Sequence, residues 1–456
     1  MTALAAQAEA DAAPRGIWRT AAIASVLAAM VMVVLDAAVA NVALPTIAQS
    51  LQVTPAVSVR VVTAYQTALV MALLPCAALG ESLGYRRVFA GGVTLFTAAS
   101  AMCALSPSLE WLLAARFLQG LGGAAVMSLG VALLRFTVSH EQLGAAIGWN
   151  ALTVALSSAA GPTVGAALLS VGSWPWLFAV NVPLGVAVVA LAGRALPKVA
   201  GTGRPLDLLS VALNAGAFAA LVVGAELAPE QPSLASVLLV SAVLGLVALV
   251  RREAPRSAPL IPLDLLRATS FRLSVIASVC CFAGQAAGMV ALPFYLQHAL
   301  GRGALATGLY ITPWPLTVAV VAPIAGRLAH RVPTGWLCAA GGACLSTGLA
   351  AAALWPLRDD ARPLVPIVML CGLGFGLFQT PNNRNMFLAA PRERSGAAGG
   401  MQGTARLVGQ TLGAVVMTLL FALAPVDMAP RMGLGFGAVL ALAAALVSAG
   451  RGGWAA

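Results

Sequence analysis

Charged side chains are scarce in this chain. Only 9% of its 456 residues are Asp, Glu, Lys or Arg, whereas 60% are hydrophobic. Ordinary soluble domains carry roughly 25% charged residues, and so few charges could not cover the surface of the two or three soluble domains that this length would form. The composition therefore excludes a soluble protein and predicts that lipid surrounds most of the chain.

The residues of common catalytic and metal sites are also few. The chain has 3 His, and its 7 Cys all lie in apolar stretches without a CxxC spacing. A metal cluster or a histidine-based catalytic site is therefore not expected, and we predict neither an enzyme nor a bound cofactor. The phosphate-binding pattern GxxxxGK[ST] is absent as well. An ion gradient, rather than ATP, is the expected energy source.

What the chain has instead is a series of long apolar runs. About 20 apolar residues cross the hydrocarbon core of a bilayer, and each such segment should be helical because an open strand would leave backbone groups unpaired in lipid. Breaks at charges and at Pro or Gly clusters therefore predict an all-α polytopic membrane protein with fourteen transmembrane helices. They are expected at residues 20–44, 57–79, 88–107, 109–135, 143–170, 174–195, 206–227, 233–250, 271–297, 305–326, 335–355, 363–387, 396–424 and 431–450.

The distribution of positive charge predicts the topology. If the N-terminus lies inside, 19 of the 26 Lys and Arg residues fall on the cytoplasmic side, 5 fall outside, and Arg116 and Arg406 lie within helices. This bias agrees with the positive-inside rule. It also explains the net charge of +11 without a nucleic-acid partner. We therefore expect a multi-pass protein of a bacterial inner membrane, with the lipid bilayer around it and both termini in the cytoplasm.

Two charged breaks suggest three parts. One spans residues 194–205 after the sixth predicted helix, and the other spans 251–272 after the eighth. The expected organisation is a six-helix bundle over 17–195, a two-helix insert over 206–250 and a second six-helix bundle over 271–450. Paired halves of this kind are typical of secondary transporters, in which one half rocks against the other around a central site.

Two short loops, at equivalent positions of the two halves, have related sequences. The first reads AALGESLGYRR over residues 77–87, and the second reads GRLAHRVP over residues 326–333. Both resemble the loop signature of the major facilitator superfamily, G-x-L-A-D-R-x-G-R-[RK]. The resemblance implies a gating loop that latches neighbouring helices, although ordinary turn and topology residues would also explain the second copy. The residues at signature positions include Glu81 in place of Asp, Gly84, Arg86, Gly326 and Arg331.

Four further motifs resemble the fourteen-helix drug:proton antiporter branch of that superfamily. LDAAVANVALP at 35–45 looks like its first-helix signature, and RFLQGLG at 116–122 looks like its proton-linked arginine motif. WPWLFAVNVPLG at 174–185 fits the junction of its fifth and sixth helices, with Pro175 in place of the usual Arg. GPTVG at 161–165 resembles its antiporter motif, which assigns that role to Gly161, Pro162 and Gly165.

Asp36 is an ionisable residue inside an apolar run, where a charge costs at least a few kcal/mol. At 1.5 Å per residue, Asp36 and Arg116 lie roughly 12 and 10 Å from the outer ends of their predicted helices, so a pair could form and lower the cost of both charges. If transport changes the water access of Asp36 or its distance from Arg116, its proton affinity changes too. We predict that this pair couples transport to protons. A fixed structural ion pair is the alternative, and a hydrophobic cation could compete for the carboxylate.

Polar side chains within the predicted helices mark the expected walls of a substrate cavity. Each of the uncharged ones could instead form a helix–helix hydrogen bond, and Arg406 could snorkel towards the cytoplasm. No acidic residue lies in the middle of the tenth or thirteenth predicted helix, which favours neutral, monovalent or amphipathic cargo over dications. The candidate residues are Asn41, Tyr65, Gln66, Gln119, Asn150, Gln285, Gln379, Asn382 and Arg406.

These features and the resemblance together predict a proton-coupled secondary transporter that exports hydrophobic or amphipathic small molecules by alternating access, as multidrug efflux proteins do. Two transport alternatives stay open, namely a narrow-specificity metabolite exporter and a proton symporter. A non-transporting membrane scaffold is the alternative from a different class, and it should tolerate the substitution Asp36→Asn.

Overall fold

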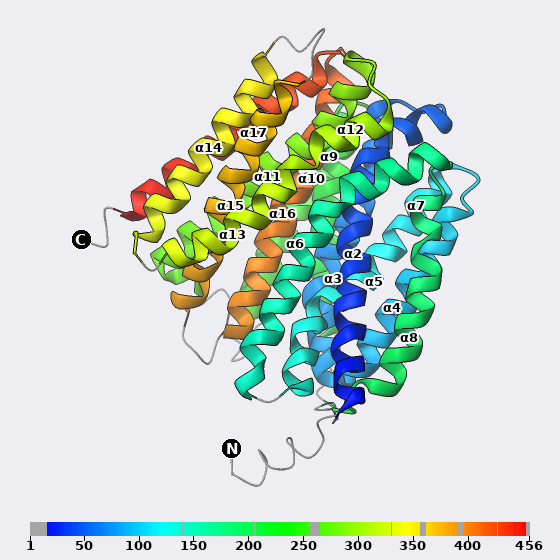
Figure 1. Cartoon of the computed structure of the whole chain (residues 1–456), viewed down its shortest axis with the longest axis vertical. Coiled ribbons are helices and arrows are strands. Elements are labelled where there is room, and N and C mark those ends of the chain that lie inside the picture. Colours follow the sequence, from blue (N-terminus) through cyan, green and yellow to red (C-terminus); the bar gives the residue numbers. More distant parts are fainter. Residues whose placement is uncertain are drawn as a thin grey trace.

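The structure, a computed structural model, contains fourteen helical segments that are long and apolar enough to cross a membrane. Every regular element in its described ranges is a helix (Figure 1), which confirms the predicted all-α polytopic fold. The described residues are 16–138, 140–199, 201, 203, 207–254, 265–329, 331–355, 362–390, 395–425 and 427–452.

The helices fall into three groups along the chain. The N-terminal helices are α2 (Ile17–Ser50), α3 (Pro55–Leu83), α4 (Tyr85–Ala104), α5 (Leu109–Thr137), α6 (His140–Val171), α7 (Trp176–Ala179) and α8 (Asn181–Ala195). Next come α9 (Leu208–Leu227), α10 (Pro232–Glu253) and the short turn η1 (Leu265–Arg267). The C-terminal helices are α11 (Thr269–Phe294) with its extension η2 (Tyr295–Ala299), α12 (Ala304–Ile311), α13 (Pro313–Leu328), α14 (Thr334–Leu354), α15 (Leu364–Leu388), α16 (Ser395–Leu423) and α17 (Ala429–Gly452).

Two helix starts illustrate how the local sequence sets the boundaries. Thr54 and Ser108 precede α3 and α5, and each side-chain oxygen accepts a hydrogen bond of 3.4 Å from a backbone N–H in the first turn. Pro55 then occupies the first position of α3, where its fixed φ fits the helix and its missing N–H has no intrahelical partner to lose.

Three predicted helices are irregular, and several are longer than expected, the first most of all. The tenth breaks at Thr312, before Pro313, and the sixth is divided at Val180 into α7 and α8. The ninth ends in the π-helical turn η2, which begins two residues after Pro293. The first helix continues through Pro45 to Ser50. Asp36 therefore lies roughly 21 Å from the outer end of α2, farther from that end than predicted.

The hydrophobic core joins the N-terminal and C-terminal helices near one end of the molecule. One cluster of buried residues contains Leu44 and Ile47 from the last turns of α2 together with Leu296 of η2. Every residue that the N-terminal helices contribute to this cluster comes from their predicted outer halves. Closer to the predicted cytoplasmic side, the buried residues divide into one cluster of the N-terminal helices joined by Leu407 and a separate cluster around Phe271.

Two seams connect the N-terminal helices with the C-terminal helices. Along one seam α3 packs against α16, and along the other α6 packs against α12 and α13. Helix α9 packs on both α3 and α16, and its Asn214 donates a hydrogen bond of 2.9 Å from Nδ2 to the carbonyl oxygen of Met71 in α3. The α9–α10 pair thus lies against the α3–α16 seam, and the α6 seam is the one that it leaves uncovered.

Candidate functional site

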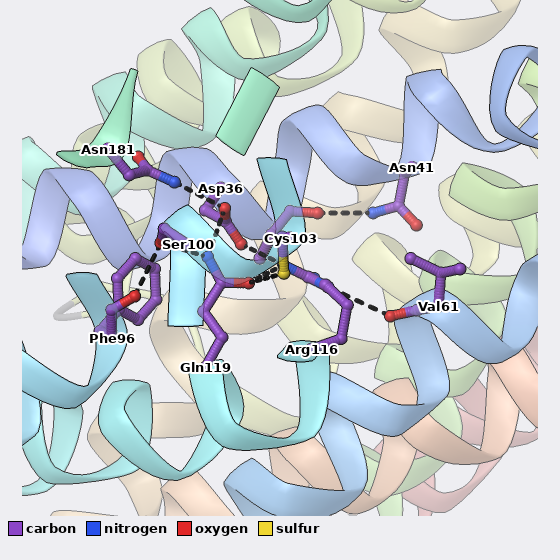
Figure 2. A network of polar contacts seen from close by, with 10 residues as sticks. Asp36, Asn41, Val61, Phe96, Ser100, Cys103, Arg116, Gln119 and Asn181 are labelled. Atoms are coloured by element: carbon purple, nitrogen blue, oxygen red, sulfur yellow. Dashed lines mark hydrogen bonds and ion pairs between the residues drawn. The ribbon is translucent and has the colours of Figure 1, made fainter. Parts of the chain in front are cut away.

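Asp36 of α2 and Arg116 of α5 form an ion pair in the interior of the N-terminal helices (Figure 2). Arg116 Nη1 lies 2.5 Å from Asp36 Oδ2, and the two residues are 3% and 1% exposed. The predicted contact is therefore present and direct. Because an unpaired buried charge is far more costly than a paired one, each residue stabilises the buried charge of the other.

The second carboxylate oxygen of Asp36 is also fully engaged. Oδ1 accepts hydrogen bonds of 2.9 Å from Gln119 Nε2 and 2.8 Å from Asn181 Nδ2. Gln119 is held in turn by Ser100 of α4, whose hydroxyl lies 2.8 Å from Gln119 Nε2 and donates to the carbonyl oxygen of Phe96. Helices α2, α4, α5 and α8 all contribute to this network, which gives both carboxylate oxygens of Asp36 hydrogen-bond donors.

Arg116 has several partners besides the carboxylate. Its Nε donates a hydrogen bond of 3.2 Å to the carbonyl oxygen of Val61, and its Nη1 lies 2.5 Å from Gln119 Oε1. The guanidinium carbon also lies over the rings of Tyr65 and Phe178, at 4.4 and 5.4 Å from their centroids, and such cation–π contacts are favourable in a desolvated site. Arg116 would therefore retain stabilising contacts if Asp36 lost its charge.

Gln119 and Asn382, two of the predicted cavity residues, are both 0% exposed. Gln119 belongs to the Asp36 network. Asn382 lies inside the C-terminal helices, where its Nδ2 donates to the Ser278 hydroxyl at 3.0 Å and its Oδ1 accepts from Arg451 Nη1 at 2.9 Å. Asn382 is therefore part of a helix–helix hydrogen-bond cluster, the alternative that the sequence left open.

The other candidate cavity residues differ in how their polar atoms are satisfied. The Asn41 amide donates to the carbonyl oxygen of Ala37 in its own helix, at 3.0 Å (Figure 2). Gln285 and Gln379 are partly exposed. The remaining four have a buried polar atom without a hydrogen-bond partner among the described residues, and these atoms are Tyr65 Oη, Gln66 Oε1, Asn150 Oδ1 and Arg406 Nε.

Residues 26–414 match the family model of the Major Facilitator Superfamily. This chain belongs to that superfamily. One relative, "Uncharacterized transporter YebQ" of Escherichia coli (strain K12), is 46% identical over 435 residues, which is 94% of this chain and 95% of the relative. Membership in this superfamily and the transporter names of relatives indicate a membrane transporter and not an enzyme.

Two further relatives are named for drug or antibiotic resistance. "Multidrug resistance protein Stp" of Mycobacterium tuberculosis is 34% identical over 393 residues, 85% of this chain and 73% of that protein. "Tetracenomycin C resistance and export protein" of Streptomyces glaucescens is 30% identical over 410 residues, 87% of this chain and 75% of that protein.

In the first superfamily loop, Arg86 links α4 to the end of α8. Its Nη1 donates to the carbonyl oxygen of Leu196 at 3.1 Å, and its Nη2 donates to that of Gly193. Gly84 connects α3 to α4 with a φ of 100°, in the region that favours glycine, and an added Cβ there would lie 2.9 Å from the carbonyl oxygen of Val199. Glu81 is exposed beside this junction. The loop thus fastens α8 to the α3–α4 turn.

The second superfamily loop is fastened differently. Arg384 of α15 donates from Nη1 to the carbonyl oxygen of Ala329, just after α13, at 3.0 Å. Gly326 faces Thr380 of α15, because an added Cβ would lie 3.5 Å from the Thr380 methyl group. Arg331 is exposed, and His330 lies outside the described residues. Helix α15, and not a neighbouring loop arginine, therefore holds the end of α13.

The antiporter motif of α6 touches both groups of helices. On one side, a Cβ added to Gly161 would lie 2.3 Å from Ala38 Cβ, and one added to Gly165 would lie 3.2 Å from Val39 of α2. On the other side, a Cβ added to Gly308 of α12 would lie 2.6 Å from the carbonyl oxygen of Pro162. These helices approach so closely because glycine has no side chain at the contacts, and α6 thereby joins the Asp36 helix to α12.

Asn181 and Ser100 were missing from the sequence-based set of site residues. The sequence signal for Asn181 was its place in the 174–185 motif, but only packing shows that α8 brings its amide to Asp36. Gly185, one turn later, allows this approach because an added Cβ would lie 1.9 Å from Thr97 Oγ1 of α4. Ser100 carries no signal in the sequence, since a serine in a transmembrane helix commonly hydrogen-bonds to its own backbone.

Proposed function

We propose that this chain is a proton-coupled exporter of hydrophobic or amphipathic small molecules, of the multidrug efflux type, that works by alternating access in a bacterial inner membrane with both termini cytoplasmic. The proposal rests chiefly on the buried Asp36–Arg116 pair, because an ionisable residue deep within membrane-crossing helices usually has a functional role. Resistance-named relatives support the efflux part of the proposal.

The proton step follows from the contacts of Asp36. A proton on Oδ2 would displace the hydrogen bond from Arg116, since a protonated carboxyl oxygen is no longer a charged acceptor. Arg116 would keep its contacts with Val61 and Gln119. Proton uptake therefore weakens the link between α2 and α5 without leaving the arginine unsatisfied, and proton release restores the link.

Helix α6 is the proposed route from this step to the rest of the molecule. Gly161 packs on Ala38, two residues after Asp36, and Pro162 packs on Gly308 of α12. A shift of α2 would therefore press on α6 and change its contact with the C-terminal helices. We propose that residues 17–195 and 271–450 rock against each other about this contact, with 206–250 as an insert beside the α3–α16 seam. In this scheme the present structure, joined at the outer ends, is closed to the outside.

A narrow-specificity metabolite exporter is the second candidate, because one relative is named for the export of a single compound. A proton symporter is the third. A panel of amphipathic compounds, screened for the thermal stabilisation of the purified protein, separates broad from narrow specificity. The direction of the proton flux that accompanies transport separates antiport from symport.

The substitution Asp36→Asn tests the coupling. Purified protein is reconstituted into liposomes, a pH gradient is imposed, and the transport of a compound selected by the panel is followed. We expect the variant to lose gradient-driven transport and to retain exchange of the compound at equal concentrations on the two sides. Asparagine keeps the shape of the side chain but cannot carry a proton.

Glu230→Gln is the matched control. It removes another carboxylate that pairs with an arginine, at 3.4 Å from Arg60, but in an exposed position at the outer ends of α9 and α3. This variant should transport at the wild-type rate. Undiminished gradient-driven transport by folded Asp36→Asn protein would remove Asp36 from the coupling role. Monodisperse elution and an unfolding transition establish that each variant is folded.

A further inference from the structure

Arg406 is a membrane-interior cation without a counter-ion among the described residues. None of the ion pairs between described side chains involves it, and its one hydrogen-bond contact runs from Nη2 to Met127 Sδ at 3.9 Å. Sulfur is a weak acceptor, and Nε is buried without a partner. Since an isolated charge in a low-dielectric interior is costly, an anion from outside the chain would stabilise this residue.

The depth of Arg406 argues against lipid headgroups as that partner, and the residue is partly exposed rather than sealed in the packing. Helix α16 runs from Ser395 to Leu423, so Arg406 lies roughly 16 Å from its inner end. The hydrocarbon core is about 30 Å thick, which places the residue near the bilayer centre. A side chain at this depth is too far from either interface to snorkel.

A second unsatisfied polar group lies about one helical turn away along α5. Tyr65 of α3 is 2% exposed, and its hydroxyl has no hydrogen-bond partner within the described part of the chain. This hydroxyl is next to Gly123 of α5, where an added Cβ would lie 2.9 Å away. Met127, the neighbour of Arg406, is one helical turn further along α5, about 6 Å by the helix rise. The guanidinium and the hydroxyl thus contact positions one turn apart on the same helix, α5.

These two groups lie where the N-terminal and C-terminal helices meet, among apolar side chains. Tyr65 and Met127 come from the N-terminal helices and Arg406 from α16, and the hydrophobic cluster around them includes Leu69 and Leu407. A cationic donor and a neutral donor set in apolar surroundings match a ligand with one anionic group on an apolar body. They do not match a cationic ligand, which Arg406 would repel.

We propose that Arg406 and the Tyr65 hydroxyl bind an anionic group of the cargo, so that the transported compounds are amphipathic organic acids carrying a carboxylate or a phenolate. This inference rests on the proposed export function and narrows its substrate class. It also gives the cargo a contact with the proton site. The Tyr65 ring that lies under Arg116 belongs to the same side chain as this hydroxyl, so bound cargo and the Asp36–Arg116 pair would share one residue.

A binding measurement on the full-length protein in lipid nanodiscs tests the proposal, with empty nanodiscs as the blank. The probes are 4-(1-pyrenyl)butanoate and the uncharged amide of the same size, 4-(1-pyrenyl)butanamide. A hydrogen-bonded charge contributes about 1.5–3 kcal/mol, so the wild type should bind the carboxylate at least about tenfold more tightly than the amide. Arg406→Gln should bring the ratio of the two affinities close to one.

Two further variants complete the test. Arg267→Gln removes an exposed arginine of η1 and should leave the ratio unchanged. Tyr65→Phe keeps the ring over Arg116 but removes the hydroxyl, and should lower the ratio about threefold to tenfold, as expected for one lost hydrogen bond. If Arg406→Gln does not fold, the affinity ratio of Tyr65→Phe tests the proposal instead.

The proposal is overturned if the wild type shows no preference for the carboxylate or no measurable binding of it. It is overturned equally if folded Arg406→Gln keeps the preference, or if Tyr65→Phe leaves it unchanged. Because no pH gradient is applied, this result is independent of proton coupling. If the anion preference is not found, the proton-coupling proposal still stands as long as gradient-driven transport depends on Asp36. If Asp36→Asn has no effect on transport, the anion-binding proposal still stands as long as the preference is found.

Discussion

The contact between α6 and the break after α12 should open during every transport cycle. The side-chain oxygens of Thr163 and Thr312 lie 2.5 Å apart there, on the two groups of helices that we propose to rock against each other. If both residues are replaced by cysteine, the sulfur atoms should take similar positions. We expect the Thr163→Cys/Thr312→Cys protein to form a disulfide readily under a membrane-permeant oxidant and then to stop transporting.

The expected size of the effect follows from disulfide geometry. The bond holds its sulfur atoms about 2.0 Å apart and its Cβ atoms at about 3.5–4.5 Å. Two hydroxyl groups already in contact fit that span, so the crosslink needs little backbone movement. An opening of the outer ends by several ångströms is impossible once it has formed. Transport should therefore fall in proportion to the crosslinked fraction, with no change in proteins that stay uncrosslinked.

The assay compares transport into liposomes before oxidation, after oxidation and after reduction. Thr163→Ser/Thr312→Ser is the matched control, because it keeps both hydroxyl groups and forms no crosslink. Each single cysteine variant controls for the 7 native cysteines. If the crosslinked protein transports at the rate of the reduced protein, the outer ends do not separate at this contact, and the proposed rocking motion about α6 is wrong.

Two further predictions concern the packing around the Asp36 network and the first loop. Gly185→Ala should destabilise the protein by about 1–3 kcal/mol, as overpacking does, because the added methyl group would collide with Thr97 at 1.9 Å. Thermal unfolding measures this loss, and Gly193→Ala, where the space is open, should not show it. Equal melting temperatures of the two variants would contradict the packing described. Arg86→Gln removes two charge-assisted hydrogen bonds to carbonyl groups at the end of α8 and should lower both the melting temperature and the transport rate. Arg87→Gln changes the exposed neighbouring arginine and should alter neither. A wild-type transport rate for Arg86→Gln would refute a latch in this loop.

Much of the fold could be predicted from the sequence because the signals for it are local. The length and apolarity of each run predicted fourteen helices, and the structure has them. The deviations occur where local rules compete. Helix α2 passes through Pro45, although a proline often marks a helix end. The chain breaks at Thr312, by contrast, next to a very similar proline. Packing against neighbouring helices decides between these outcomes, and it is not visible in a single run.

The candidate site divides in the same way. The sequence alone determined that Asp36 and Arg116 are buried charges, because each interrupts an apolar run and must find a partner at similar depth. Only the tertiary structure decided that they meet directly, that Asn181 joins them from α8, and that Arg406 has no carboxylate beside it in the described residues. A helix can be read from its own residues, whereas the direction of a side chain and the identity of its partner depend on helices that are distant in sequence. The cost of a charge in lipid is therefore a property of the sequence, and its neutralisation is a property of the fold.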